Sequence, residues 1–121
     1  FVVEQGSEHT VTFRYKLSGG SYQDLTGWRI RMSVKDHITD TAYVYQATSD
    51  SSEDSGYNQH FTITSPQAND TLGEFSITIP TATTTGFTFN QGVYDLELID
   101  DNDAVTRLLE GKFKISKQVP E

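Results

Sequence analysis

The stretch WRIRMSVK, residues 28–35, alternates apolar and polar side chains and decides the fold class. Its polar face is cationic, because it carries Arg29, Arg31 and Lys35. Side chains of a strand point alternately to its two faces, so this period of two indicates a strand that is buried on one side. The same alternation recurs over residues 9–17, 73–79 and 93–99.

Short segments rich in glycine, serine, asparagine, aspartate or proline separate the alternating stretches. The longest, TSDSSEDSGYN at 48–58, has no apolar period and is expected to form a solvated loop. The only helical signal is a single turn over 81–86, where the threonines are poor helix formers. Further strands are expected at 41–47, 60–64 and 104–116.

Seven or eight short strands without a convincing helix predict an all-β fold. The first choice is an immunoglobulin-like antiparallel β-sandwich of 7–8 strands, and a small barrel is the second. Gly19 and Gly20 are expected to turn a hairpin, and Gly111 is expected to mark a bulge or a bend between the two halves of the last strand. The segment 60–64 is expected to pair with 73–79. The expected core includes Trp28, Phe75, Tyr94, Leu96 and Phe113.

The composition bounds the class of protein. The 121 residues fit one domain, expected over residues 1–121, and they carry 9 Lys and Arg against 17 Asp and Glu, a net charge of −8. This acidic balance argues against phosphate neutralisation, so no nucleic-acid partner is expected. No apolar run is long enough to span a bilayer, so no membrane partner is expected either. The chain opens at Phe1 rather than at methionine, which suggests that the natural protein is longer at this end.

Few residues are candidates for chemistry, and the protein is expected not to be an enzyme. There is no cysteine, which removes thiolate ligands and thiol nucleophiles. His9, His37 and His60 lack the close spacing that brings imidazoles onto one zinc ion, and we interpret them as partly exposed strand-end residues. No serine sits in the GxSxG pattern of a nucleophile elbow.

Two acidic turns, at 50–54 and 100–103, offer oxygen ligands of the kind that calcium prefers. Neither turn has the spacing of an EF-hand loop, so each is interpreted as a solvated turn, with calcium as the alternative. No metal and no cofactor is therefore assigned.

The candidate contact residues are cations and aromatics. Arg29, Arg31 and Lys35 form the one concentrated cationic patch, which would suit an acidic partner. The alternative is pairing with the chain's own carboxylates, such as Glu97 or Glu110. A third arrangement would bring the acidic loop of one copy to this patch on the next copy. Three tyrosines in loops or on ambiguous faces complete the candidate set, and they are Tyr43, Tyr45 and Tyr57.

Four blocks of sequence resemble small immunoglobulin-like structural domains of tailed-phage virions. They are DLTGW running into RIRMSVK (24–35), GEFSITIP (73–80), GVYDLELID (92–100) and VTRLLEGKFKIS (105–116). In this order they look like the N-terminal domains of phage baseplate upper proteins and small tail proteins.

The resemblance implies a non-enzymatic virion protein, assembled in the host cytoplasm, that works in symmetric copies. The expected role is a tail, baseplate or neck adaptor that docks fibres or neighbouring tail proteins, and homo-oligomerisation within the assembly is expected. A capsid decoration protein is one alternative, and a carbohydrate-binding or host-adhesion module with aromatic loops is another.

Overall fold

A computed structural model describes residues 1–117 and contains eight strands and one short helix within them. The longest connection lies between β2 and β3, and further long loops lie between β3 and β4, between β4 and β5 and between β5 and β6. The elements in chain order are β1 (Val2–Glu4), β2 (His9–Arg14), β3 (Arg29–Lys35), β4 (Tyr45–Thr48), β5 (Phe61–Ile63), β6 (Glu74–Ile79), α1 (Thr81–Thr85), β7 (Gln91–Ile99) and β8 (Val105–Ser116).

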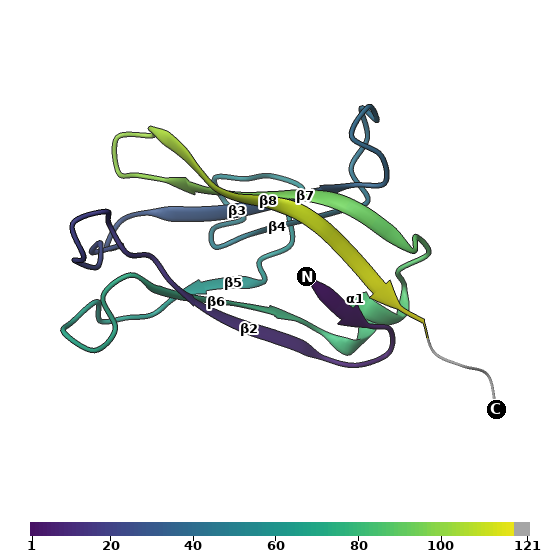
Figure 1. The fold of residues 1–121 in the computed structure, drawn as a ribbon, viewed down its shortest axis with the longest axis horizontal. Helices are drawn as coiled ribbons and strands as arrows, with labels where there is room; N and C mark the ends of the chain where they lie inside the picture. Colours follow the sequence, from purple (N-terminus) through teal and green to yellow (C-terminus); the bar gives the residue numbers. More distant parts are fainter. Residues whose placement is uncertain (118–121) are drawn as a thin grey trace.

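The strands form two sheets that lie face to face in a sandwich-like arrangement (Figure 1). The larger sheet has the order β1-β8-β7-β3-β4, and the smaller has the order β2-β6-β5. All neighbours are antiparallel except β1 and β8, which run parallel. The prediction of an all-β fold is confirmed.

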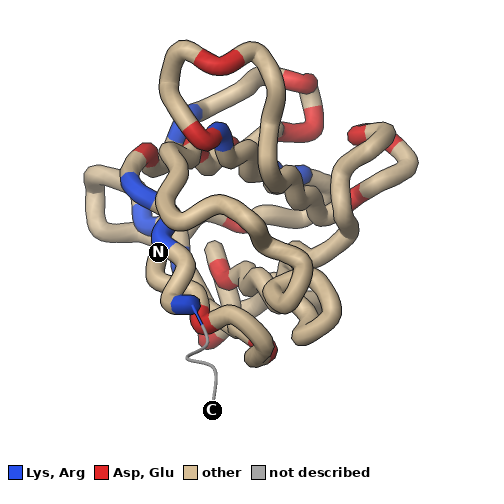
Figure 2. The backbone as a smooth tube through the Cα atoms, turned by 90° about the vertical axis from the view of Figure 1, so that its right-hand side faces the viewer, with Lys and Arg blue, Asp and Glu red and all other residues tan. Residues whose placement is uncertain are grey.

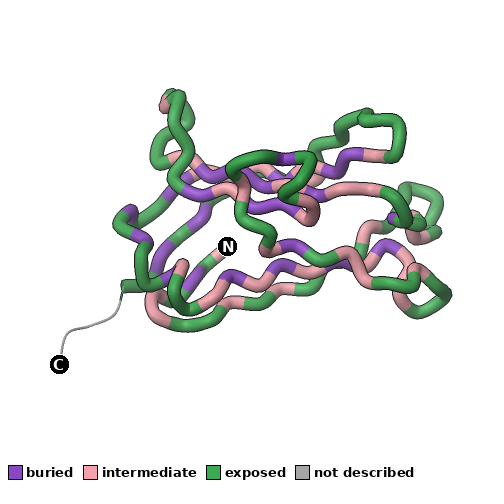
Figure 3. The backbone as a smooth tube through the Cα atoms, turned by 180° about the vertical axis from the view of Figure 1, so that it is seen from behind, coloured by how far each residue is buried: buried purple, intermediate pink, exposed green. Residues whose placement is uncertain are grey.

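The core lies between the sheets, because each contributes one apolar face to it (Figure 3). In β3 the alternation places Ile30, Met32 and Val34 inside. Of the predicted core residues, Phe75, Leu96 and Phe113 are buried, whereas Trp28 and Tyr94 are half-buried and pack against the core.

The predicted hairpin between 60–64 and 73–79 is confirmed as β5 and β6, with Phe61 opposite Ile77 and Ile63 opposite Phe75. The glycine turn after β2 closes locally, because the Leu17 N–H donates to the Ser21 carbonyl oxygen at 2.7 Å. It does not join two neighbouring strands, however. The strands on either side of it, β2 and β3, belong to different sheets.

The bulge predicted at Gly111 is elsewhere. The register between β7 and β8 shifts where Leu96 faces Leu109 and Glu97 faces Arg107, so Leu108 is the extra residue. Gly111 instead lies opposite Tyr94, and a Cβ there would stand 3.3 Å from the Tyr94 ring. The glycine therefore leaves room for the aromatic ring. A glycine in a strand can mark either a bulge or a close contact of this kind, and the sequence alone does not distinguish the two.

The strand predicted over 41–47 is shorter than expected. Its residues before Tyr45 belong to a loop, residues 36–44, that rises from the end of β3 above the larger sheet (Figure 1). The helical turn predicted over 81–86 is present as α1, and Pro80 occupies its N-cap.

Candidate interaction surface

The outer face of the larger sheet carries the polar half of the β3 alternation. Arg31 lies opposite Glu97 of β7, and its Nε donates to Glu97 Oε1 at 2.9 Å. Farther along, Arg107 of β8 lies 3.8 Å from Asp95 and 3.5 Å from Glu110. Charges of opposite sign therefore alternate across three strands of this face.

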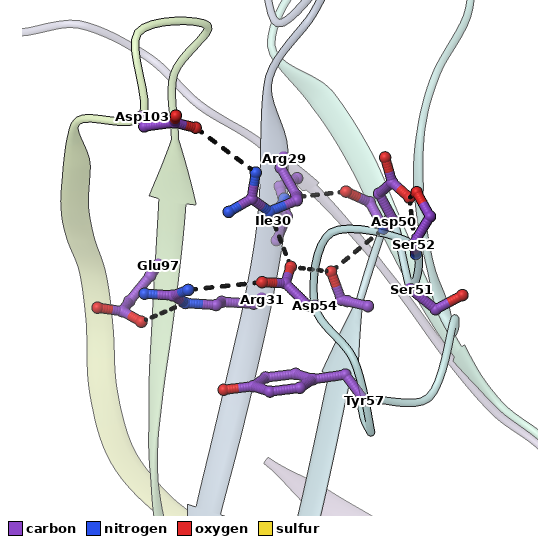
Figure 4. Close-up of polar contacts among 12 residues, drawn as sticks. Arg29, Ile30, Arg31, Asp50, Ser51, Ser52, Asp54, Tyr57, Glu97 and Asp103 are labelled. Atoms are coloured by element: carbon purple, nitrogen blue, oxygen red, sulfur yellow. Dashed lines mark hydrogen bonds and ion pairs between the residues drawn. The ribbon is translucent and has the colours of Figure 1, made fainter.

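The loop of residues 49–58, here called the acidic loop, crosses the same face beside β3 (Figure 4). Its Asp54 is only 7% exposed and accepts a hydrogen bond from Arg29 Nε at 2.8 Å. Asp54 also accepts one from the buried Thr48 hydroxyl at 2.7 Å, and its other oxygen lies 3.5 Å from Arg31 Nη1. Most residues of the acidic loop are exposed, as expected for a solvated loop, and Asp54 is its one buried residue. Its buried carboxylate is stabilised by these cationic and hydroxyl partners.

Three hydrogen bonds that involve the backbone fix the acidic loop in this position. The Ser49 N–H donates to the Ile30 carbonyl oxygen at 2.9 Å, and the Ile30 N–H donates to the Ser49 hydroxyl at 2.9 Å. At the far end of the loop, the Thr48 N–H donates to the Asn58 carbonyl oxygen at 2.8 Å. The loop is thus tied at both ends to the edge of the larger sheet.

The cationic patch is largely neutralised within the chain. Arg29 pairs with Asp54 and approaches Asp103 at 3.8 Å, while Arg31 pairs with Asp54 and Glu97. The alternative of pairing with Glu97 is confirmed, whereas Glu110 pairs with Arg107 rather than with the patch. The acidic loop meets the patch from the same chain, so this patch is not left as an open site for an acidic loop of a second copy.

The three candidate tyrosines occupy different environments. Tyr57 lies across the outer face beside the ion pairs (Figure 4), with its hydroxyl oxygen 3.4 Å from Ser33 Oγ. Tyr43 is 48% exposed, and Lys35 Nζ lies 5.1 Å from the centre of its ring. These two tyrosines and Lys35 remain on the surface.

Tyr45 was expected among the contact residues, and that prediction is wrong because its side chain is buried. It lies opposite Val34, packs against Phe87 and Phe113, and shares a hydrogen bond of 2.6 Å with His60 Nδ1. Burial raises the pKa of the Tyr45 hydroxyl well above its usual range. Residues of β4 do alternate between its two faces, but Tyr45 lies on the face that points into the core.

An open groove of about 560 Å³ lies between the 36–44 loop and the outer face. Ile38 and Tyr43 line one side of the groove, and Asp95, Arg107 and Lys112 line the other. Burial, followed by the nearby charge of Glu97, raises the pKa of Asp95. One side of the groove is therefore apolar and the other is charged, so the groove suits a segment that carries both apolar and charged side chains.

The 36–44 loop exposes more apolar surface than its polar sequence suggests. Ile38 is 79% exposed and Val44 is 40% exposed, in addition to Tyr43. Sequence reasoning missed Ile38, because it is a lone aliphatic residue between His37 and Thr39 with no period around it. One signal in the sequence could have identified Ile38: it is a large apolar residue in a turn-rich segment that has no alternating pattern to bury it.

The carboxylates of the acidic turns serve the turns themselves. Asp50 Oδ1 accepts a hydrogen bond from the Ser52 N–H at 3.0 Å, and Asp100 Oδ1 accepts from the Asn102 and Ala104 N–H groups at 2.9 Å. Within residues 1–117, no three His, Asp or Glu side chains gather closely enough to hold a metal ion. The same residues include no helix long and apolar enough to cross a membrane.

Comparison with known proteins gives no family for this chain. No protein-family model matches it, and a search of curated proteins finds no significant match.

Proposed function

We propose that this chain is a non-enzymatic structural protein of a tailed-phage virion. Its role is that of a tail, baseplate or neck adaptor, present in symmetric copies and docking fibres or neighbouring tail proteins. The site is assigned to protein–protein contact, with no nucleic-acid or membrane partner and no cofactor.

The fold proposed with this role is the immunoglobulin-like sandwich. In that architecture one sheet has the strand order G-F-C, extended by C′ in the variable type, and the other has the order B-E-D. The run β8-β7-β3-β4 follows the first order and β2-β6-β5 follows the second. The topology therefore supports the structural class that the sequence blocks resemble, although one fold serves many functions.

The observation that carries the docking role is the contrast between the two parts of the outer surface. The polar groups beside β3 are occupied by the chain's own acidic loop. The 36–44 loop, by comparison, presents Ile38, Tyr43 and Val44 to solvent. A group of exposed apolar side chains on one projecting loop is typical of a surface that another protein covers.

The test is quantitative mass spectrometry of purified phage particles from the source of this chain, with the cleared lysate as control. The proposal predicts a fixed copy number in particles, and a small multiple that fits a ring supports the tail, baseplate or neck position. A copy number comparable with that of the major capsid protein would instead assign the chain to the capsid surface, as a decoration protein. Finding the chain only in the free lysate would overturn the virion role and favour adhesion instead.

A further inference from the structure

An apolar slot of about 300 Å³ opens between the two sheets on the β2 and β8 side. Phe13 and Tyr15 line it from the β2 side, and Leu108 and Leu109 line it from β8. Leu109 is 44% exposed although it lies opposite the fully buried Leu96.

The slot is open because the edge of the larger sheet is only partly covered there. β1 pairs with β8 over Lys114, Ile115 and Ser116. Within residues 1–117, no strand pairs with the outer edge of β8 from Val105 to Gly111. The bulge at Leu108 also interrupts the regular pattern at this edge, which disfavours simple addition of another strand.

Cations border the slot. Arg14 and Lys16 are among its lining residues, and neither forms an ion pair within residues 1–117. The Arg14 guanidinium is held in place, because its Nε donates to the Leu72 carbonyl oxygen at 2.9 Å and its carbon lies 3.6 Å from the centre of the Tyr22 ring. A positive charge thus stands fixed beside an apolar opening.

The 36–44 loop has the complementary character. Ile38, its most exposed apolar side chain, lies in the sequence between Asp36 and Asp40. Neither aspartate forms an ion pair in the described part of the chain, although Asp40 Oδ2 accepts a hydrogen bond from the His37 N–H at 3.0 Å. Figure 2 shows acidic positions on this loop at the top of the molecule.

We propose that the 36–44 loop of one copy docks into the slot between β2 and β8 of a second copy. Ile38 enters the apolar opening, and Asp36 and Asp40 face Arg14 and Lys16 of the other chain. This proposal deepens the proposed function, on which it rests, by naming the contact through which copies of the chain assemble.

A molecule cannot fill its own slot with this loop. The loop rises above the outer face of the larger sheet at its β3 and β4 side (Figure 1). The slot is lined from the other side of the molecule, by residues next to or within β2, β6, β7 and β8, and it opens on the β8 side of β7. The contact is therefore heterologous, since two different surfaces meet. Repetition of such a contact gives a closed ring when the rotation closes, and otherwise a filament.

The first test is cross-linking between two variants, which the absence of native cysteine makes clean. An Ile38→Cys chain is mixed with a Leu109→Cys chain and treated with a short bis-maleimide. The expected product is a mixed dimer that exceeds either self-linked dimer. An Ile38→Cys chain mixed with a Val2→Cys chain is the control, because Val2 is 61% exposed but lies on β1. Equal yields in the two mixtures would overturn the proposal.

The second test is self-association of the whole chain, measured by sedimentation velocity up to about 1 mM, the limit of weak binding. Ile38→Asp and Leu109→Asp are each expected to weaken association by about tenfold or more. Val2→Asp is the matched control and is expected to leave it unchanged. A chain that stays monomeric throughout, or that associates regardless of both slot and loop variants, would overturn the proposal.

Charge reversal distinguishes a contact from a fault in folding. Asp36→Lys and Lys16→Glu are each expected to weaken association, and the double variant is expected to regain at least part of it because opposite charges again face each other. Additive loss in the double variant would contradict the assigned pairing of these surfaces.

These experiments use purified protein and so are separate from the particle test. A chain found in virions whose loop does not cross-link to the slot would refute only this contact. Specific cross-linking of a chain that is absent from virions would refute only the virion role.

Discussion

Replacing Asp54 by asparagine tests whether the acidic loop is part of the folded structure or only rests on its surface. The substitution keeps the size and one carbonyl acceptor of the side chain but removes its charge. In the structure, Asp54 accepts hydrogen bonds from Arg29 and Thr48 while its own side chain is 6% exposed. The change thus leaves a guanidinium and a buried hydroxyl with a weakened partner.

The magnitude follows from those contacts. A hydrogen bond to a charged group contributes about 1.5 to 3 kcal/mol, and removal of one member of a buried ion pair costs about 3 to 5 kcal/mol. Arg31 keeps Glu97, and Arg29 keeps only the 86% exposed Asp103, whose contribution is small. We therefore expect Asp54→Asn to lower the free energy of unfolding by about 2 to 3 kcal/mol.

Urea denaturation followed by the fluorescence of Trp28 measures this value. Glu53→Gln is the matched control, because it removes a negative charge from the neighbouring exposed position of the same loop. It should change the free energy of unfolding by less than about 0.5 kcal/mol. If Asp54→Asn had an effect as small as that of Glu53→Gln, the reasoning that the loop buries a needed carboxylate would be refuted.

Three further predictions concern the scaffold. Gly73→Ala should lower the free energy of unfolding by about 2 kcal/mol or more, because the φ of Gly73 is 78° and a Cβ would stand 2.5 Å from the Tyr15 carbonyl oxygen. Gly20→Ala is the control in the same urea assay. Gly20 has a φ of 94° but open space around it, so its replacement should cost about 1 kcal/mol. Phe113→Ala should cost about 3 to 5 kcal/mol by calorimetry, since the ring is fully buried, and a smaller loss would place it outside the core. Burial lowers the pKa of His60, so protonation of this imidazole favours the unfolded chain. The free energy of unfolding should therefore fall as the pH drops below about 6.5, and His60→Gln should make that fall less steep. An equally steep fall in the His60→Gln variant would contradict the assignment of the pH dependence to His60.

The alternating strands could be predicted from the sequence because period two directly records burial on one face. The pattern in β3 identified Ile30, Met32 and Val34 as inward, and the pairing of β5 with β6 followed from two apolar runs that are consecutive in the sequence. Both inferences depend on local information. The partition of strands into two sheets depends on long-range packing, so the glycine turn after β2 gave no sign that β2 and β3 separate.

The candidate site was predicted less well, for a physical reason that its residues illustrate. Arg29 and Arg31 were correctly placed on one outward face, but their neutralisation by Asp54 brings together residues from different elements through a loop with no period. Tyr45 was misassigned because a four-residue strand between two loops leaves its inward face undetermined by alternation. Ile38 was missed because exposure in a loop leaves no pattern in the sequence.

Incorporation into particles tests most directly the claim that this chain assembles through its exposed apolar loop. Tagged Ile38→Asp and tagged Val2→Asp chains are each produced beside the untagged chain during phage growth, and the tagged fraction in purified particles is compared with that in the lysate. The account predicts that Val2→Asp enters particles as the unmodified sequence does, while Ile38→Asp is depleted by about tenfold or more. Equal incorporation of the two variants would contradict it.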